Sequence, residues 1–232
     1  MIGISLNSSF HKEELLATVI ARLIADARHV AVGAASPIPA TAAFLLRQKN
    51  PAFRISLLQK RKGNPFSEGS RELFDLAGQG RIDAFFLGGA QIDGEGNVNL
   101  VGAEGRRFPG SFGSAFMYGA VKQTILFREE HSKRVLVPKV EFVSAAGNPD
   151  ALLTGKALFG WNRERRRFVL RSYHYCDGVD DVRRNTGFEF DLLPEGVTET
   201  PPPAPEELNI LRTAVAKQIA VDYPEFAKRV WG

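Results

Sequence analysis

The 232-residue sequence contains a single cysteine, Cys176, and only four histidines. One cysteine excludes an internal disulfide and a zinc site built from several thiolates, which fits a reducing compartment such as the cytoplasm. Cys176 is therefore expected to pack as a small apolar side chain. His131 and His174 show no ligand-like spacing, so both are expected to be ordinary surface or core residues, and no metal site is predicted.

Long apolar runs are also absent. In the first 24 residues apolar positions alternate with charges at helical spacing, so neither a signal peptide nor a membrane span is expected. The net charge of +4 comes from local clusters such as QKRKG and NRERRRF. These clusters contain few aromatic residues and match no nucleic-acid-binding motif. An anionic small molecule accounts for them equally well, and nucleic acid is not expected as a partner.

The first half of the chain alternates helical and strand patterns. Apolar residues recur at helical spacing in HKEELLATVIARLIADA, and short apolar, partly β-branched segments follow. Helices are expected over residues 11–27, 39–48 and 70–80, and strands over 29–33, 53–59 and 82–89. Three such alternations predict an α/β fold in which helices cover a sheet with a parallel core.

The second half is richer in strand patterns. A short helix is expected near GVDDVRRN, followed by a strand, and a proline-rich connector at about 193–205 leads to a C-terminal helix at about 204–222 and an aromatic tail. Further strands are expected over residues 121–127, 140–146, 157–162 and 167–175. No internal repeat occurs, so residues 1–232 are expected to form one domain.

The segment FFLGGAQIDGEGNVNL, residues 85–100, is the most informative stretch of the sequence. It reads as a strand, a double-glycine break, a turn at GEGN and a second short strand. Gly88 and Gly89 stand at the carboxyl end of a predicted parallel strand, where open α/β sheets bind ligands. Spacing alone is equally compatible with a tight turn that binds nothing.

The sequence of residues 85–100 resembles a motif in the B subunits of class I CoA-transferases of the glutaconate CoA-transferase type. RRFPGSFGSA at 106–115 resembles the glycine-rich loop that follows the motif in that family. VEFVSAAG at 140–147 resembles a strand before the CoA-proximal region, and GVDDVRRNTGFEF at 178–190 resembles the closing motif. The four motifs occur in the family's order between residues 85 and 191.

This resemblance implies an α/β subunit that pairs with an A-type subunit and shares its active site with it. In such enzymes a glutamate at the end of the second core strand of the B subunit attacks an acyl-CoA thioester. A carboxylate small molecule finally accepts the CoA, so CoA is a substrate and no permanently bound cofactor is expected. Backbone N–H groups would stabilise the oxyanion, and the candidates are Gly88, Gly89, Gly110 and Gly113.

The nucleophile position is where this sequence departs from the family. Gln59 follows the strand FRISLL in the glutamate's place, and a carboxamide is too poor a nucleophile to form the acyl anhydride. Gln59 could instead orient a water or a carbonyl, as donor and acceptor together. Glu68, in the segment SEG, is an alternative nucleophile, although an acid before the helix 70–80 also suits a capping role.

Three functions therefore stay open. The chain could be the B-type component of an acyl-CoA transferase with a carboxylate acceptor, a subunit of a ring-opening CoA-thioester hydrolase, or a scaffold that binds CoA or a partner without catalysis. Arg106, Arg107 and Lys60, the last in the basic run 60–62, are candidate contacts for CoA, or else solvated cations. Phe112 either narrows the approach of a substrate or packs beneath its loop.

Overall fold

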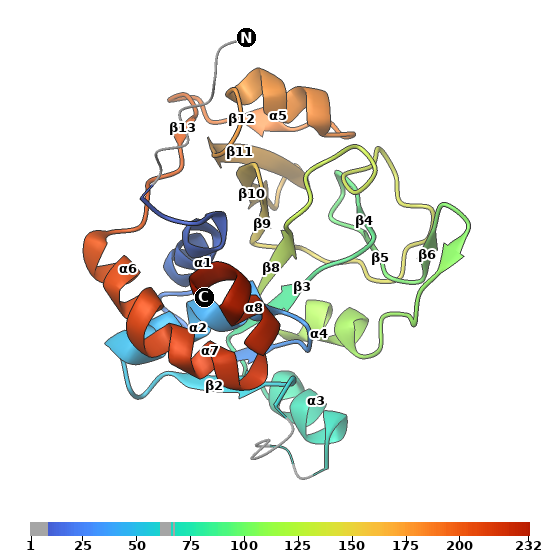
Figure 1. The fold of residues 1–232 in the computed structure, drawn as a ribbon. Helices are drawn as coiled ribbons and strands as arrows, with labels where there is room; N and C mark the ends of the chain where they lie inside the picture. The colour runs from blue at the N-terminus through green and yellow to red at the C-terminus, as the bar shows by residue number, and fades with distance from the viewer. Residues whose placement is uncertain (1–8, 61–65, 67) are drawn as a thin grey trace.

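The computed structural model describes residues 9–60, 66 and 68–232, which form a nine-stranded sheet between two layers of helices and loops (Figure 1). The strand order is β12-β11-β10-β9-β8-β3-β1-β2, and β13 pairs with β11. The parallel strands are β1 (His29–Val32), β2 (Arg54–Leu57), β3 (Ala84–Leu87), β8 (Gln123–Arg128) and β9 (Ala151–Thr154). The antiparallel hairpin is β10 (Ala157–Asn162) and β11 (Arg167–Tyr173), and β12 (Asp191–Leu192) and β13 (Thr198–Glu199) run parallel to β11.

Helices connect the strands, and two small hairpins extend from the sheet. The helices are α1 (Lys12–Leu23), α2 (Pro37–Lys49), α3 (Ser70–Gly78), α4 (Ser114–Ala120), α5 (Val179–Asn185), α6 (Pro205–Ile210), α7 (Ala216–Asp222) and α8 (Pro224–Trp231). A π-helical turn, η1 (Leu211–Val215), joins α6 to α7 without a break. The hairpins are β4 (Gln91–Ile92) with β5 (Val98–Asn99), and β6 (Gly102–Ala103) with β7 (Arg106–Arg107).

Both faces of the parallel strands are buried. Val30 and Val32 of β1 pack in the core formed by α1, α2 and the C-terminal helices, whereas Ala31 packs on the opposite side with α3 and α4. In the same way, Phe86 of β3 packs in the core with Val30 and Val32, and Phe85 packs in the core with Ala31. Successive residues of a strand point to opposite faces, so a sheet covered on both sides requires strands that are apolar throughout. The predicted α/β fold with a parallel core is confirmed.

One predicted strand is wrong, and several elements were not predicted, among them the short strands β6, β7 and β13. Residues 140–146 form no strand, because they lie beside the small hairpin β4–β5 and contribute only an isolated bridge between Ala145 and Val98. Strand β9 and helix α4 were missed, and the expected aromatic tail is helix α8. Pro224 begins that helix, where its missing N–H costs nothing, and Phe226 and Val230 are buried on its inner face.

A buried carboxylate ties the two ends of the described chain together. Glu14 of α1 is fully buried, and the guanidinium of Arg212 donates to both of its oxygens at 2.8 Å. The indole N–H of Trp231 and the backbone N–H of His11 donate to the same carboxylate, at 3.0 and 2.8 Å. Burial alone would raise the pKa of Glu14, but these donors lower it below its usual value. The pair therefore fastens η1 and α8 onto α1.

Arg212→Met should destabilise the fold by about 3 kcal/mol, because it leaves a buried carboxylate without its charged partner. Arg163→Met is a matched control, since Arg163 is largely exposed and pairs with Asp150 at the surface. It should cost less than about 1 kcal/mol. Urea denaturation of the variants measures both values, and an Arg212→Met loss no larger than that of the control would contradict the assignment.

Two histidines, His131 and His174, are buried and form hydrogen bonds inside the protein. The ring nitrogens of His131 lie 2.7 and 3.1 Å from the hydroxyls of Thr154 and Thr186. Those of His174 lie 2.9 Å from the Thr200 hydroxyl and 3.0 Å from the Thr154 carbonyl oxygen. Burial lowers the pKa of each histidine to about 4. Both rings are therefore neutral in the folded protein at neutral pH.

Acid should destabilise the protein between about pH 6.5 and about pH 4. Unfolded histidines take up protons near pH 6.5, while the folded rings resist protonation until about pH 4. The stabilisation is complete above the upper value and is lost as pH falls, by roughly 3 kcal/mol per histidine. Denaturation curves at several pH values measure this slope. His131→Gln and His174→Gln should each flatten it, and an unchanged slope in both variants would refute the explanation.

Candidate active site

The carboxyl ends of the parallel strands meet at one edge of the sheet. Residues 33–36 follow β1, Gln59 follows β2, Gly88 and Gly89 follow β3, and residues 129–130 follow β8. Three cavities open along this edge, and Gly88 lines all of them. Open α/β sheets bind ligands outside the carboxyl ends of their strands. This edge is therefore the candidate active site, and the cavities are named below by their lining.

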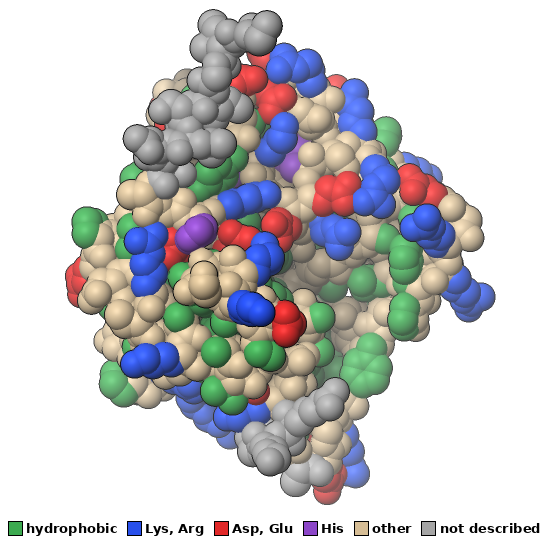
Figure 2. Space-filling view, in the orientation of Figure 1, with side chains coloured by type: hydrophobic (Ala, Val, Ile, Leu, Met, Phe, Trp, Pro, Cys, Tyr) green, Lys and Arg blue, Asp and Glu red, His purple; other side chains and the backbone are tan. Residues whose placement is uncertain are grey.

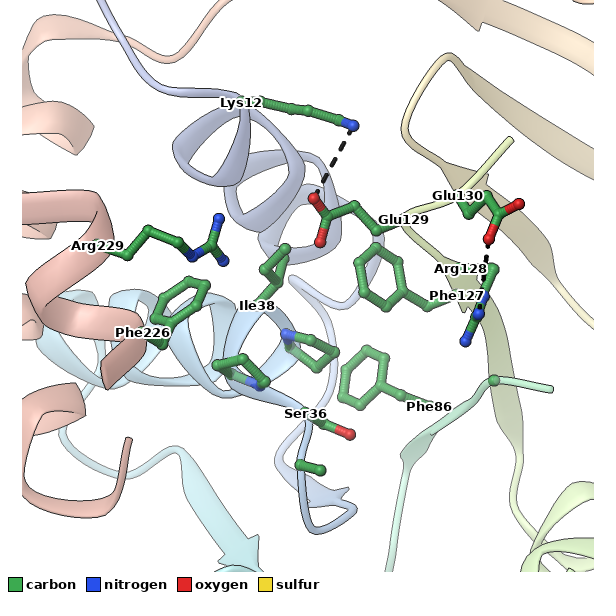
Figure 3. Close-up of a pocket in the computed structure, with 14 residues that line it drawn as sticks. Lys12, Ser36, Ile38, Phe86, Phe127, Arg128, Glu129, Glu130, Phe226 and Arg229 are labelled. Atoms are coloured by element: carbon green, nitrogen blue, oxygen red, sulfur yellow. Dashed lines mark ion pairs between the residues drawn. The ribbon is translucent and has the colours of Figure 1, made fainter. Parts of the chain in front are cut away.

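The charged cavity has a volume of about 630 Å³ and lies between the start of α2, the end of β8 and helix α8 (Figure 3). Lys12 of α1 and Glu129 point toward one another across it, with Nζ and Oε1 3.9 Å apart. Glu130 accepts hydrogen bonds from Ser132 and Arg134. Burial would raise the pKa of Glu130, but these donors lower it, so the carboxylate stays ionised.

The basic cavity, of about 410 Å³, lies on the other side of Gly88 against the β6–β7 hairpin. Arg106, Arg128 and Arg134 line it, together with one acid, Glu104. The Nε–H of Arg128 is buried and has no hydrogen-bond partner among the described residues. Three guanidinium groups on one wall are suited to an anionic ligand.

The apolar cavity, of about 550 Å³, lies between the strand ends and helices α3 and α4. Its described lining includes no charged side chain. Phe112 borders it with 85% of its surface exposed, and its ring lies 6.3 Å from that of Phe74. Phe112 therefore does not pack beneath its loop. Figure 2 shows charged side chains around a central hollow and hydrophobic ones on its lower-right rim, over α4.

The two proposed nucleophile positions lie in different surroundings. Gln59 is half-buried at the end of β2, and its Oε1 accepts a hydrogen bond of 3.3 Å from the backbone N–H of Ala35. Ala35 has a φ of +52°, in the left-handed region, and lines the charged cavity. Gln59 itself lines none of the three cavities. Through its hydrogen bond to Ala35 it supports the loop that follows β1.

Glu68 is exposed to solvent beside the apolar cavity, which its neighbours Gly69 and Ser70 line. Its side chain is 64% exposed and pairs with Arg71 at 3.3 Å, and it lines none of the three cavities. The capping role suggested by the sequence is wrong, because the N-cap of α3 is Gly69 and no side chain caps it. At this helix end the backbone N–H of Glu68 donates to Glu72, and its carboxylate pairs with Arg71 of the first turn.

Gly88 and Gly89 have little room for a side chain. A Cβ on Gly88 would lie 2.9 Å from the carbonyl oxygen of Phe127, and a Cβ on Gly89 would lie 2.4 Å from a methyl group of Val98. Contacts within the chain therefore already require glycine at both positions. Gly110 lines the basic cavity, and Gly113 lines the apolar cavity. The four glycines thus all lie along the candidate site.

Only one of the three basic residues predicted from the sequence lines the candidate site. Arg106 lines the basic cavity, whereas Arg107 and Lys60 are exposed and line none of the three cavities. Arg61 and Lys62 of the same basic run lie outside the described residues. Sequence reasoning missed several charged side chains of the site. They are Lys12, Arg128, Glu129, Glu130, Arg134 and Arg229.

Other chemistry is limited in the part of the chain that the structure describes. No group of three or more His, Cys, Asp or Glu residues there could hold a metal ion. The same residues include no helix that is long and apolar enough to span a membrane. Cys176 is half-buried, and burial raises the pKa of its thiol. A protonated thiol in this position suits packing rather than nucleophilic attack.

Two kinds of sequence comparison identify relatives. Residues 53–158 match the family model described as coenzyme A transferase. The chain is 30% identical over 141 residues to the B subunit of glutaconate CoA-transferase from Acidaminococcus fermentans, covering 51% of this chain and 52% of that protein. It is 29% identical over 162 residues to the B subunit of 3-oxoadipate CoA-transferase from Pseudomonas knackmussii, covering 61% and 62%. The chain thus spans about half the length of the first relative and about three fifths of the second.

Solved structures share the fold. Glutaconate CoA-transferase of Acidaminococcus fermentans superposes with a TM-score of 0.75 at 22% identity, covering 88% of this chain and 94% of that one. The decarboxylase AibA/AibB gives a TM-score of 0.74 at 24% identity with the same coverage. IpdAB of Rhodococcus jostii RHA1 gives 0.72 at 22% identity, covering 89% and 94%. Residues 53–158 thus match the coenzyme A transferase family, and the chain is similar in sequence to the B subunits of two CoA-transferases and shares its fold with the solved structures.

Proposed function

We propose that the chain is the B-type subunit of a two-chain enzyme that acts on an acyl-CoA thioester without forming a glutamyl intermediate on this chain. The observation that carries the proposal is the position of Gly88, which ends the central strand β3 and lines all three cavities. A thioester at this point would have arginines on one side and apolar side chains on the other. The names of the curated relatives support an A-type partner and CoA as a substrate.

The basic cavity suits the phosphate groups of CoA. Arg106, Arg128 and Arg134 lie on its wall, and guanidinium groups bind phosphate oxygens in a bidentate fashion. The nearby Glu130 keeps Arg128 oriented, with Nη2 and Oε2 3.8 Å apart.

The glutamine at position 59 limits which reactions the chain could catalyse. Its carboxamide cannot carry an acyl anhydride, and the exposed Glu68 does not reach the cavities. For transfer, the acceptor carboxylate would attack the thioester carbonyl directly and release the CoA thiolate. That thiolate would then attack the acceptor carbonyl of the resulting anhydride and release the first acid. Backbone N–H groups at Gly88 and Gly89 would stabilise the oxyanion, each by about 3 kcal/mol.

Hydrolysis is the second candidate, and the same absence of a carboxylate at residue 59 favours it. A water molecule would attack the thioester carbonyl, lose a proton to a base and expel CoA as the thiol, leaving a free acid. The side chains of Glu129 and Glu130 are the carboxylates nearest the end of β8. Both are engaged by cations, Lys12 and Arg134 respectively, so an A-type partner would have to supply the base or free one of them.

Gln59→Glu tests the nucleophile position. In the complex with an A-type subunit, incubation with acyl-CoA and a carboxylate acceptor should leave no adduct on the wild-type chain. A carboxylate at residue 59, next to Leu58 of the apolar cavity, should form a hydroxylamine-sensitive thioester with CoA, detected by peptide mass spectrometry. The ratio of acceptor-CoA to free CoA separates transfer from hydrolysis. Glu68→Gln should keep wild-type turnover, and an adduct on Glu68 in the wild type would overturn the proposal.

Arg128→Gln tests the place of CoA. Loss of one charged hydrogen bond to phosphate should weaken CoA binding about tenfold. Arg107→Gln is the matched control, because Arg107 is exposed on the same hairpin but outside the cavity, and it should change the affinity less than twofold. Calorimetric titration of CoA into the two-chain complex measures both. Equal losses of CoA affinity in the two variants would contradict the assignment of the basic cavity as the CoA site.

A further inference from the structure

The apolar cavity differs in composition from its two neighbours. The charged cavity is lined by five charged side chains and the basic cavity by four. The described lining of the apolar cavity has none, and its polar side chains are three serines, Ser36, Ser70 and Ser114. Its floor consists of buried side chains, among them Leu73, Leu87 and Met117. A volume of about 550 Å³ is ordinary for a small-molecule site, for which the range is about 300–1,000 Å³.

We propose that this cavity binds the acyl group of the substrate and that this group is a hydrocarbon, aliphatic or aromatic, without a second carboxylate. The inference rests on the proposed function, since it takes the thioester to lie at Gly88. A carboxylate in this cavity would lose its hydration without gaining a cationic partner from the described lining. A hydrocarbon loses no hydrogen bonds there and gains the burial of its apolar surface.

Phe112 is the side chain that such a ligand would cover. It is 85% exposed and has a φ of +48°, which is an uncommon backbone conformation for a large side chain. Phe74 on α3 lies between Phe112 and Phe116, with ring centroids 6.3 and 5.5 Å away. These rings form an apolar rim next to Gly113, and an acyl group in the cavity would shield the rim from water.

Gly88 links this cavity to the CoA side of the site. The same residue lines the apolar and the basic cavities, so a thioester carbonyl beside it would direct the acyl chain one way and the pantetheine arm the other. Leu58, next to Gln59, also lines the apolar cavity. The residue in the family's nucleophile position is therefore adjacent to the proposed acyl site rather than inside it.

The test compares two acyl-CoA thioesters of equal chain length, hexanoyl-CoA and adipoyl-CoA, with acetyl-CoA and CoA as references. Each is titrated into the two-chain complex. Hexanoyl-CoA should bind more tightly than acetyl-CoA, by roughly fourfold for each methylene that becomes buried. Adipoyl-CoA should bind no better than acetyl-CoA. Equal or tighter binding of adipoyl-CoA would overturn this inference alone, whereas failure of every compound to bind, CoA included, would overturn the proposed function as well.

A matched pair of variants locates the acyl group. Phe112→Ser should weaken hexanoyl-CoA binding about fivefold and leave CoA binding unchanged, since removing a ring from one wall forfeits part of its apolar contact. Phe142→Ser makes the same chemical change at a side chain that is 53% exposed and lines none of the three cavities, and it should change neither affinity. The inference fails if Phe112→Ser weakens all CoA compounds alike, or alters only subunit association while hexanoyl-CoA keeps its advantage.

Discussion

The parallel pairing of β2, β1, β3 and β8 is the constraint on which the rest of the structure depends. Parallel strands need helical crossovers, and the crossovers cover both faces of the sheet. The strands must then be apolar, so polar chemistry is confined to the segments that follow them. Gly88 ends β3, which lies inside the sheet between β1 and β8, and this position explains why three cavities with different linings share it. The topology of the sheet therefore determines where the candidate site lies, and the side chains determine only how each cavity is lined.

The buried carboxylate of Glu14 connects this topology to the site. It holds Arg212 and Trp231, and through them it fixes the C-terminal helices against α1. Helices α1 and α8 supply Lys12 and Arg229 to the charged cavity. One wall of that cavity is thus made by residues far apart in the sequence, and its shape depends on an ion pair between the buried Glu14 and the partly exposed Arg212.

The sequence predicted the α/β core because local signals and tertiary environment agree there: short apolar segments alternate with amphipathic ones. Residues 140–146 have the same local signal, yet they meet only a two-stranded hairpin and stay irregular. The glycine positions of the site could be located because their spacing is local. Arg128, Arg134 and the apolar cavity could not, because they depend on which strand ends become neighbours and on helix α4, features that no single segment encodes.

Gln59 and the apolar cavity are physically compatible. A glutamine keeps the oxygen that accepts the N–H of Ala35, so the left-handed turn after β1 retains its support when the charge is absent. A carboxylate at the same place would stand beside Leu58 and the uncharged cavity, where an acyl chain would displace water from it. Desolvating an ion costs far more than desolvating an amide. A neutral side chain at residue 59 is therefore compatible with the proposed binding of a hydrocarbon beside Leu58.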